Sequence, residues 1–169
     1  MIVVAYWFVK QGTHKPLITM QQILPNLRSI YLLSDVSYPT QKYENHLLNS
    51  GVNEVKVFDD SQDFINQLIF EPDAVIIEHS VQPFNGLEVL KKIRRQNPDL
   101  PVIYLSAQQD MKITVDALKF GAFDYIIKGE SDLEHLTDVL SRLKRFLHEI
   151  NLRNKRSFVG ILSSITKLF

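Results

Sequence analysis

The sequence of 169 residues contains no cysteine, which excludes disulfides and thiolate metal sites and fits the cytoplasmic location that we predict. Long apolar runs are missing as well. Residues 2–9 form an apolar run much shorter than the roughly 20 residues of a membrane-spanning helix, so we expect no membrane contact. Neither sign of charge is in excess, because 19 Lys and Arg residues balance 19 Asp and Glu residues. This balance gives no reason to expect nucleic acid or another polyanionic partner.

Motifs for several classes of enzyme are also absent. The sequence has no Gly-rich phosphate loop, no nucleophile elbow and no zinc-ligand spacing, and its five histidines are scattered. We therefore predict that the protein is not an enzyme and that it requires no cofactor. What is present is a globular composition, with 45% hydrophobic and 22% charged residues, in a chain long enough for one domain with a substantial core.

From residue 29 onward, short apolar runs alternate with helix-compatible segments. The two clearest runs, 73–77 and 101–105, are apolar almost throughout, which is typical of a parallel sheet covered by helices on both faces. We therefore predict an α/β fold: a doubly wound, five-stranded parallel sheet in a three-layer sandwich. The predicted strands are 29–33, 54–58, 73–77, 101–106 and 123–127, and the predicted helices are 38–50, 61–70, 86–96, 111–120 and a long helix from Asp132 to about 150.

Polar residues at several positions indicate where the helices begin and end. Ser61 is a candidate N-cap for the helix 61–70, and Asp59 and Asp60 are predicted to be turn and N-cap residues. Asn85-Gly86 could form a hairpin turn, but the helical pattern that follows favours a junction between a loop and a helix. Gly121 suits a left-handed C-cap.

Four polar side chains follow predicted strands, at the edge of the sheet where α/β folds bind ligands. They are Asp35, Glu78, Ser106 and Lys128. Two carboxylates, a lysine and a hydroxyl are the equipment for acyl-phosphate chemistry with magnesium, which prefers oxygen ligands. A weak magnesium site would use Asp35, Glu78 and Ser80.

The chain resembles the receiver domain of two-component response regulators, in the segments "LLSD" (32–35), "DAVIIE" (73–78), "NGLEVLKKIR" (85–94), "PVIYLSA" (101–107) and above all "ALKFGAFDYIIK" (117–128). The resemblance covers residues 28–148 and implies a flavodoxin-like (β/α)5 sheet with strand order 2-1-3-4-5. Residues 1–27 are then an N-terminal extension, either a native segment with an extra strand or upstream sequence before a start at Met20. Residues 149–169 are a basic and apolar C-terminal extension that is expected to be helical.

The resemblance also implies roles for individual residues. Lys128 matches the lysine that contacts the phosphoryl group, and Ser106 matches the switch hydroxyl, although it could simply cap its strand. Tyr125 matches the aromatic residue that changes rotamer with signalling state, although core packing is the simpler interpretation. Asp35 matches one member of the acidic pair that holds magnesium. Glu78 falls where the family has its phosphorylated aspartate.

The sequence departs from the family pattern at four positions. Ser34 replaces one acid of the pair, Glu78 replaces the acceptor aspartate, and Gln82 and Gly129 stand where prolines are expected. A cis bond before a non-proline residue costs about 2.5–4 kcal/mol, so we expect the loop after Lys128 to follow another path.

The extra methylene of Glu78 moves its carboxylate by roughly an ångström, and misplacement by about 1 Å can cost on the order of 100-fold in rate. Loss of the acid at Ser34 weakens magnesium binding as well. Three interpretations of Glu78 stay open: a structural ion pair with Lys128, a constitutive mimic of the phosphorylated state, and retained phosphorylation.

We predict a stand-alone, degenerate receiver domain that acts in signal transduction through contact with a signalling protein, either a histidine kinase or a downstream effector. The first candidates for this surface are Lys119, Tyr125 and Arg142, and a homodimer could form through the last helix. The basic stretch from Arg142 onward is either a solvated helix face or a docking surface. The alternative is a magnesium-dependent phosphoacceptor phosphorylated on Glu78 by a histidine kinase, and a third interpretation is a fragment of a longer regulator.

Overall fold

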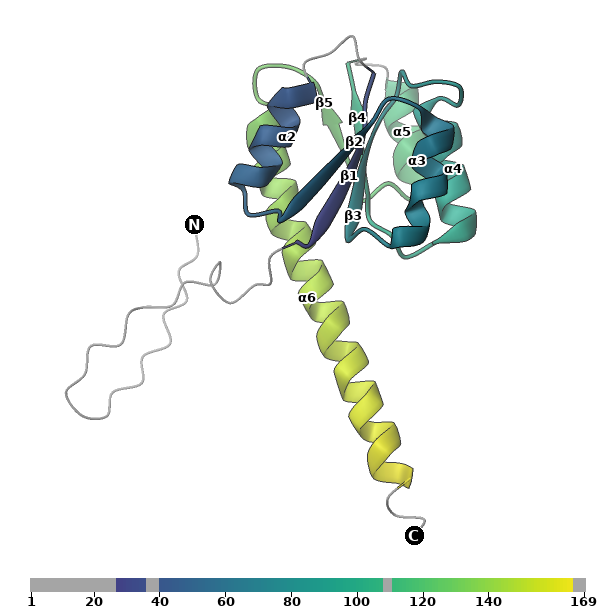
Figure 1. Ribbon diagram of the computed structural model, residues 1–169, viewed down its shortest axis with the longest axis vertical. Helices are drawn as coiled ribbons and strands as arrows, with labels where there is room; N and C mark the ends of the chain where they lie inside the picture. The colour runs from purple at the N-terminus through teal and green to yellow at the C-terminus, as the bar shows by residue number, and fades with distance from the viewer. Residues whose placement is uncertain (1–26, 36–39, 108–110, 166–169) are drawn as a thin grey trace, which may run out of the picture. The chain divides into compact units, whose positions relative to one another are not determined.

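The computed structural model describes residues 27–35, 40–107 and 111–165, with side chains as far as Arg153. Five strands form one parallel sheet in the order β2-β1-β3-β4-β5 (Figure 1). They are β1 (Ser29–Leu33), β2 (Glu54–Phe58), β3 (Ala74–Glu78), β4 (Val102–Ser106) and β5 (Asp124–Ile127). The predicted five-stranded, flavodoxin-like sheet and its strand order are therefore confirmed. The predicted extension at residues 1–27 lies outside the described residues, apart from Leu27.

Helices cover both faces of this sheet. Figure 1 shows α3, α4 and α5 on one face, with α2 and the beginning of α6 on the other. The helices are α2 (Thr40–Asn49), α3 (Ser61–Gln67), the 3-10 turn η1 (Leu68–Phe70), α4 (Gly86–Gln96), α5 (Met111–Lys119) and α6 (Asp132–Ile165). The three predicted layers are therefore present.

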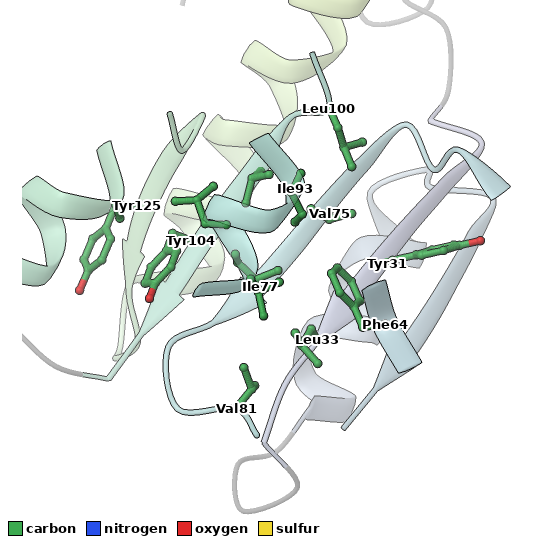
Figure 2. Close-up of a cluster of buried hydrophobic side chains, with 14 residues drawn as sticks. Tyr31, Leu33, Phe64, Val75, Ile77, Val81, Ile93, Leu100, Tyr104 and Tyr125 are labelled. Carbon is green, nitrogen blue, oxygen red and sulfur yellow. The ribbon is translucent and has the colours of Figure 1, made fainter. Parts of the chain in front are cut away.

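The core fills both sides of the sheet because successive side chains of a strand point to opposite faces. Tyr31, Val75 and Tyr104 belong to the buried cluster under α3, α4 and α5 (Figure 2). Their neighbours Ile30 and Ile76 are equally buried but lie outside that cluster, on the opposite face. Burial on both faces explains why the central strands are almost entirely apolar in sequence.

The predicted helix 61–70 begins at Ser61, as expected, but one of its two predicted caps is wrong and its last turn differs. Asp60 is the N-cap, as predicted, and its carboxylate accepts hydrogen bonds from the N–H groups of the second and third helical residues. Ser61, the predicted N-cap, is instead the first helical residue, and its buried hydroxyl accepts a hydrogen bond of 2.9 Å from the N–H of Phe84. At the other end the α-helix tightens into η1 and stops at Glu71, whose φ of 51° is left-handed.

The junction at Asn85-Gly86 is a helix start, as predicted. The Asn85 side chain accepts a hydrogen bond from the N–H of Glu88, whose carboxylate accepts one from the N–H of Asn85, so that the two form a capping box. Gly121 follows α5 with a φ of +90°, which confirms the predicted left-handed C-cap. These local signals explain why α4 has the predicted bounds and why the bounds of α5 differ from the prediction by a single residue.

Residues Asn26–Leu143 form one compact unit, and the residues of α6 from Lys144 onward belong to a second unit. The helix runs to Ile165, so most of the predicted extension 149–169 has a helical backbone, and residues 166–169 lie outside the described part. None of the helices in the described residues combines the length and the apolar character needed to cross a bilayer.

Candidate functional site

Three side chains from different strands meet at the carboxyl edge of the sheet. Glu78 ends β3, Ser34 follows β1 and Lys128 follows β5. Ladder hydrogen bonds continue one residue past β1 and β5, from Ser34 N–H to Phe58 O (3.0 Å) and from Lys128 N–H to Ser106 O (2.8 Å). The backbone therefore stays extended, and side-chain alternation places Ser34, Glu78 and Lys128 on the same face of the sheet.

Both oxygens of the Glu78 carboxylate have partners. Oε1 forms an ion pair with Lys128 Nζ. Oε2 accepts hydrogen bonds from the Ser34 hydroxyl at 2.8 Å and from the Asp35 N–H at 3.1 Å. The side chains of Lys128 and Glu78 are only 2% and 7% exposed, so this is an ion pair largely removed from water.

The length of Glu78 suits this position. β4 lies between β3 and β5, so the ion pair spans two strand spacings, roughly 10 Å. The long side chain of Lys128 spans most of that distance. Glutamate has one methylene more than aspartate, so the Glu78 carboxylate reaches further toward the Lys128 ammonium group. Ser106 ends the intervening β4 and is completely buried there.

The predicted magnesium ligands Asp35, Glu78 and Ser80 have different environments. Asp35 contributes its backbone N–H to Glu78, and Ser80 is exposed in the turn after β3. The ammonium group of Lys128 sits against one Glu78 oxygen, and two hydrogen-bond donors hold the other. No group of three His, Asp or Glu residues is placed to hold a metal in the part of the chain that the structure describes. Because Lys128, the Ser34 hydroxyl and the Asp35 N–H already engage both Glu78 oxygens, this carboxylate does not fit the role of a Mg²⁺ ligand.

Tyr125 points into the core, where it is 6% exposed. Its ring stacks on that of Tyr104, with centroids 5.7 Å apart and planes inclined by 11° (Figure 2). Tyr125 therefore has the environment of a core residue.

The Tyr104 hydroxyl lies 2.6 Å from His79 Nδ1, and burial raises the pKa of that hydroxyl. A Cβ on Gly86 would lie 2.8 Å from the Tyr104 hydroxyl, so only glycine fits there without a shift.

The other residues predicted for the partner surface are exposed. Lys119 ends α5, and Arg142 lies on α6, where its guanidinium forms an ion pair with Asp124 of β5. Tyr125 itself is buried, which agrees with the simpler interpretation of this residue as core packing, and its place on the partner surface stays a prediction.

A second buried carboxylate, which the sequence did not reveal, lies at the start of α6. Asp132 accepts hydrogen bonds from Lys42 Nζ (2.7 Å), the Tyr43 hydroxyl (2.5 Å) and the N–H of Gly129 (3.2 Å). Burial would raise its pKa, but these hydrogen bonds and the charge of Lys42 outweigh burial and hold the pKa below the ordinary value. The hydrogen bond to the Gly129 N–H also holds the loop after Lys128, and the peptide bond before Gly129 is trans, as expected from the cost of a cis bond there.

From the sequence alone we noted at Ser34 only the absence of an expected acid. In the structure the Ser34 hydroxyl donates a hydrogen bond to Glu78. Its position, one residue past an apolar strand, was the feature of the sequence that could have indicated this contact. Asp132 gave none, because its partners lie about ninety residues away in sequence.

Comparison with known proteins agrees with the fold. The model of the response regulator receiver domain matches residues 32–141. The regulatory protein AtoC of Escherichia coli is 30% identical over 106 residues, which are 63% of this chain and 21% of AtoC. The response regulator SaeR of Staphylococcus aureus is 32% identical over 88 residues, which are 50% of this chain and 39% of SaeR. The matched part thus spans well under half of either relative.

Solved structures show the same fold. A response regulator receiver domain protein from Clostridium thermocellum superposes with a TM-score of 0.67 at 23% identity, covering 73% of this chain and 99% of that one. A CheY-like receiver domain protein from Methanospirillum hungatei gives 0.64 at 19% identity, with coverage of 73% and 99%. With five parallel strands in the expected order, a lysine paired to an acid at the strand ends, and a family model matching most of the sheet, the chain belongs to the response regulator receiver domain family.

Proposed function

We propose that this receiver domain acts in two-component signalling through protein–protein contact, without phosphotransfer. The observation that carries the proposal is the engagement of both Glu78 oxygens by Lys128, Ser34 and the Asp35 N–H. A nucleophilic carboxylate needs one oxygen free to attack phosphorus. Here attack would require breaking an ion pair or two hydrogen bonds that are shielded from water.

The serine at position 34 supports the same proposal. Phosphoryl transfer depends on positive charge placed against the phosphoryl oxygens as charge develops. Ser34 cannot supply the carboxylate that would hold magnesium, and its hydroxyl donates to Glu78 instead. We therefore propose that the domain neither requires magnesium nor catalyses its own phosphorylation.

Intact-mass spectrometry after incubation with acetyl phosphate and magnesium tests this proposal. We expect no phosphoryl adduct on the wild-type chain and an adduct on Ser34→Asp/Glu78→Asp, which restores both carboxylates at their shorter length. Glu134→Asp, an exposed change on α6, is the matched control and should stay unmodified. An adduct on the wild-type chain that disappears in Glu78→Gln would establish the alternative, a phosphoacceptor on Glu78.

The charge of Glu78 next to Lys128 leaves a second interpretation, a constitutive mimic of the phosphorylated domain. Its charge of −1 is smaller than the about −1.5 to −2 of a phosphate. We favour a structural pair without switching, because every partner of Glu78 belongs to the fold itself. Hydrogen exchange of Glu78→Gln separates the two: a structural pair predicts faster exchange around Ser34 and Lys128, whereas a mimic predicts an additional change in α5 and β5.

The face formed by α5, β5 and the first part of α6 is our proposed partner surface. Met111, Val115 and Leu118 are exposed on α5 at spacings of four and three residues, so they lie on one side of that helix. Ile127 adds an exposed apolar side chain on β5, and Lys119 and Arg142 supply charge. An apolar stripe with charged residues beside it is suited to a signalling protein or to a second copy of the chain.

The proposed surface has a direct test. Leu118→Glu should weaken binding of a cognate signalling protein, or abolish a homodimer seen by light scattering, while leaving thermal stability unchanged, and Leu48→Glu on α2 is the matched control. Whether the domain stands alone in a cytoplasmic protein or belongs to a longer regulator stays a prediction. The size of the native product on an immunoblot tests it.

A further inference from the structure

A basic pocket lies between α4 and α5, remote from the strand-end site. It has a volume of about 430 Å³ and is lined by Lys91, Arg94, Arg95 and Phe120. The Arg94 guanidinium donates hydrogen bonds to the carbonyl of Leu100, just before β4, and to the carbonyl of Gly121, just before β5. The pocket is therefore at the amino ends of these strands, whereas Glu78 and Lys128 are at the carboxyl ends.

The positive charge of this pocket is not neutralised by ion pairs. Lys91, Arg94 and Arg95 form no ion pair in the described ranges 27–35, 40–107 and 111–153. Arg94 donates hydrogen bonds to four uncharged carbonyls, those of Asn97, Pro98, Leu100 and Gly121. Partial burial lowers its pKa, and the carboxylate of Asp99 acts in the opposite direction. A partly desolvated cation held only by carbonyls attracts an anion.

Two groups at the pocket are held in place before any ligand arrives. Lys91 Nζ lies 4.2 Å from the centre of the Phe120 ring, within the range of a cation–π contact. The Phe120 ring is 40% exposed and provides an apolar wall. Because Lys91 already rests on the Phe120 ring, binding costs less side-chain entropy than it would for a lysine without such a contact.

We propose that this pocket binds an acidic segment of a partner protein that carries an aromatic or aliphatic residue between carboxylates. Lys91 and Arg95 would contact the carboxylates, Arg94 would contribute its charge, and the apolar residue would pack on Phe120. A volume of about 430 Å³ holds only a few side chains, which suits a short peptide segment.

The chemistry of the pocket favours a peptide over a nucleic acid. Arg94 is committed to backbone carbonyls, so it cannot offer the planar fork that recognises a phosphate with two hydrogen bonds. The remaining cations are confined to one turn of α4, and the whole chain has a formal net charge of +0. Nucleic-acid sites instead extend a basic surface over several phosphates.

A titration of the ¹⁵N-labelled full chain with the blocked peptide EEFEE, followed by amide chemical shifts, tests the inference. We expect saturable shifts at Lys91, Arg95, Phe120 and Gly121. The peptides QQFQQ and EEAEE should bind more weakly, since each removes one component of recognition. Lys91→Glu/Arg95→Glu should weaken EEFEE by about tenfold or more.

Arg145→Glu/Arg153→Glu, which changes net charge equally on exposed α6 positions, is the matched control and should bind EEFEE like the wild-type chain. Equal shifts with QQFQQ, or unchanged binding by Lys91→Glu/Arg95→Glu, would overturn the proposal. Stronger binding of a short single-stranded oligonucleotide at the same amides would also overturn it, in favour of nucleic acid. None of these outcomes depends on whether Glu78 accepts a phosphoryl group.

Discussion

Glu78 and Asp132 are both buried carboxylates paired with a lysine and a hydroxyl, yet they lie in different parts of the fold. Glu78 connects three strands of the sheet through Lys128 and Ser34. Asp132 connects α6 to α2 through Lys42 and Tyr43. The same set of chemical groups thus lies at the carboxyl edge of the sheet in one case and at a helix–helix contact in the other.

The two sites differ most in the exposure of the lysine. The Lys42 side chain is 32% exposed and reaches Asp132 from the surface, whereas Lys128 is 2% exposed. A lysine at the surface can return to water when its partner is lost, but a buried lysine cannot. A buried ion pair at the sheet edge is therefore a stronger constraint on the fold than its counterpart at the helix contact.

Replacing the lysine at each site is the most direct test of the difference between the Glu78 and Asp132 sites. Lys128→Ala should lower the free energy of unfolding by about 3–5 kcal/mol, because it leaves Glu78 buried without its countercharge. Lys42→Ala, the matched change, should cost about 1–2 kcal/mol, since the Tyr43 hydroxyl and the Gly129 N–H still donate to Asp132. Urea denaturation measures both values. Equal losses would mean that the exposure of the lysine does not distinguish the two sites.

Neutralising Asp132 should have the next largest effect on the free energy of unfolding, and the size of this effect should depend on pH. Asp132→Asn should cost about 1.5–3 kcal/mol at pH 7, where hydrogen bonds from a cation and a phenol stabilise the carboxylate. Because the folded-state pKa of Asp132 is depressed, this contribution is complete above its unfolded pKa of about 3.9 and disappears as pH falls through the lower folded value. The gap between wild type and variant should therefore close below about pH 4 in urea titrations. A gap that stays constant there would contradict a depressed pKa.

The contrast between the two carboxylates also explains what the sequence could predict. Glu78 ends an apolar strand, and parallel strands deliver their carboxyl ends to one edge, so its proximity to Lys128 follows from topology. Asp132 is an acid in the first turn of a helix, a common position on the surface. Its burial depends on how α6 packs on Tyr43, and no local pattern encodes that packing.

The fold was predictable for the same reason, and its details fail where tertiary contacts compete with local signals. α4 has the predicted bounds because Asn85 and Glu88 form a local capping box. Ser61 and Asp60 were both candidate caps, but the Ser61 hydroxyl accepts a hydrogen bond from the Phe84 N–H, and Asp60 caps the helix. The contact of Ser34 with Glu78 was missed because the family resemblance directs attention to the acid expected at this position rather than to the serine hydroxyl.

Removing one hydroxyl at each site sharpens the comparison. Tyr43→Phe should cost about 1.5–2 kcal/mol, because a completely buried carboxylate loses a short donor at 2.5 Å. Ser34→Ala should cost about 1 kcal/mol, since the Asp35 N–H still donates to the same Glu78 oxygen. Thermal unfolding in the same buffer ranks the pair, and Ser141→Ala on the exposed side of α6 provides a baseline. A larger loss of stability in Ser34→Ala than in Tyr43→Phe would mean that the hydroxyl contributes more at the Glu78 site than at the Asp132 site.

The smallest expected effect concerns His46, which lies beside the Asp132 site on α2. Its Nε2 is 2.9 Å from the Thr137 hydroxyl. Burial lowers its pKa, and the charge of Lys42 lowers it further, while Asp132 acts in the opposite direction. A histidine whose folded pKa is depressed binds protons more readily when unfolded, so stability should decline as pH falls through about 6.5. His46→Gln keeps a donor for Thr137 and should remove that part of the decline between about pH 7 and pH 5, which the difference between the two urea titrations isolates. If the two stability curves stay parallel over this range, His46 does not titrate at the helix contact, and the pH dependence around Asp132 comes from the carboxylate alone.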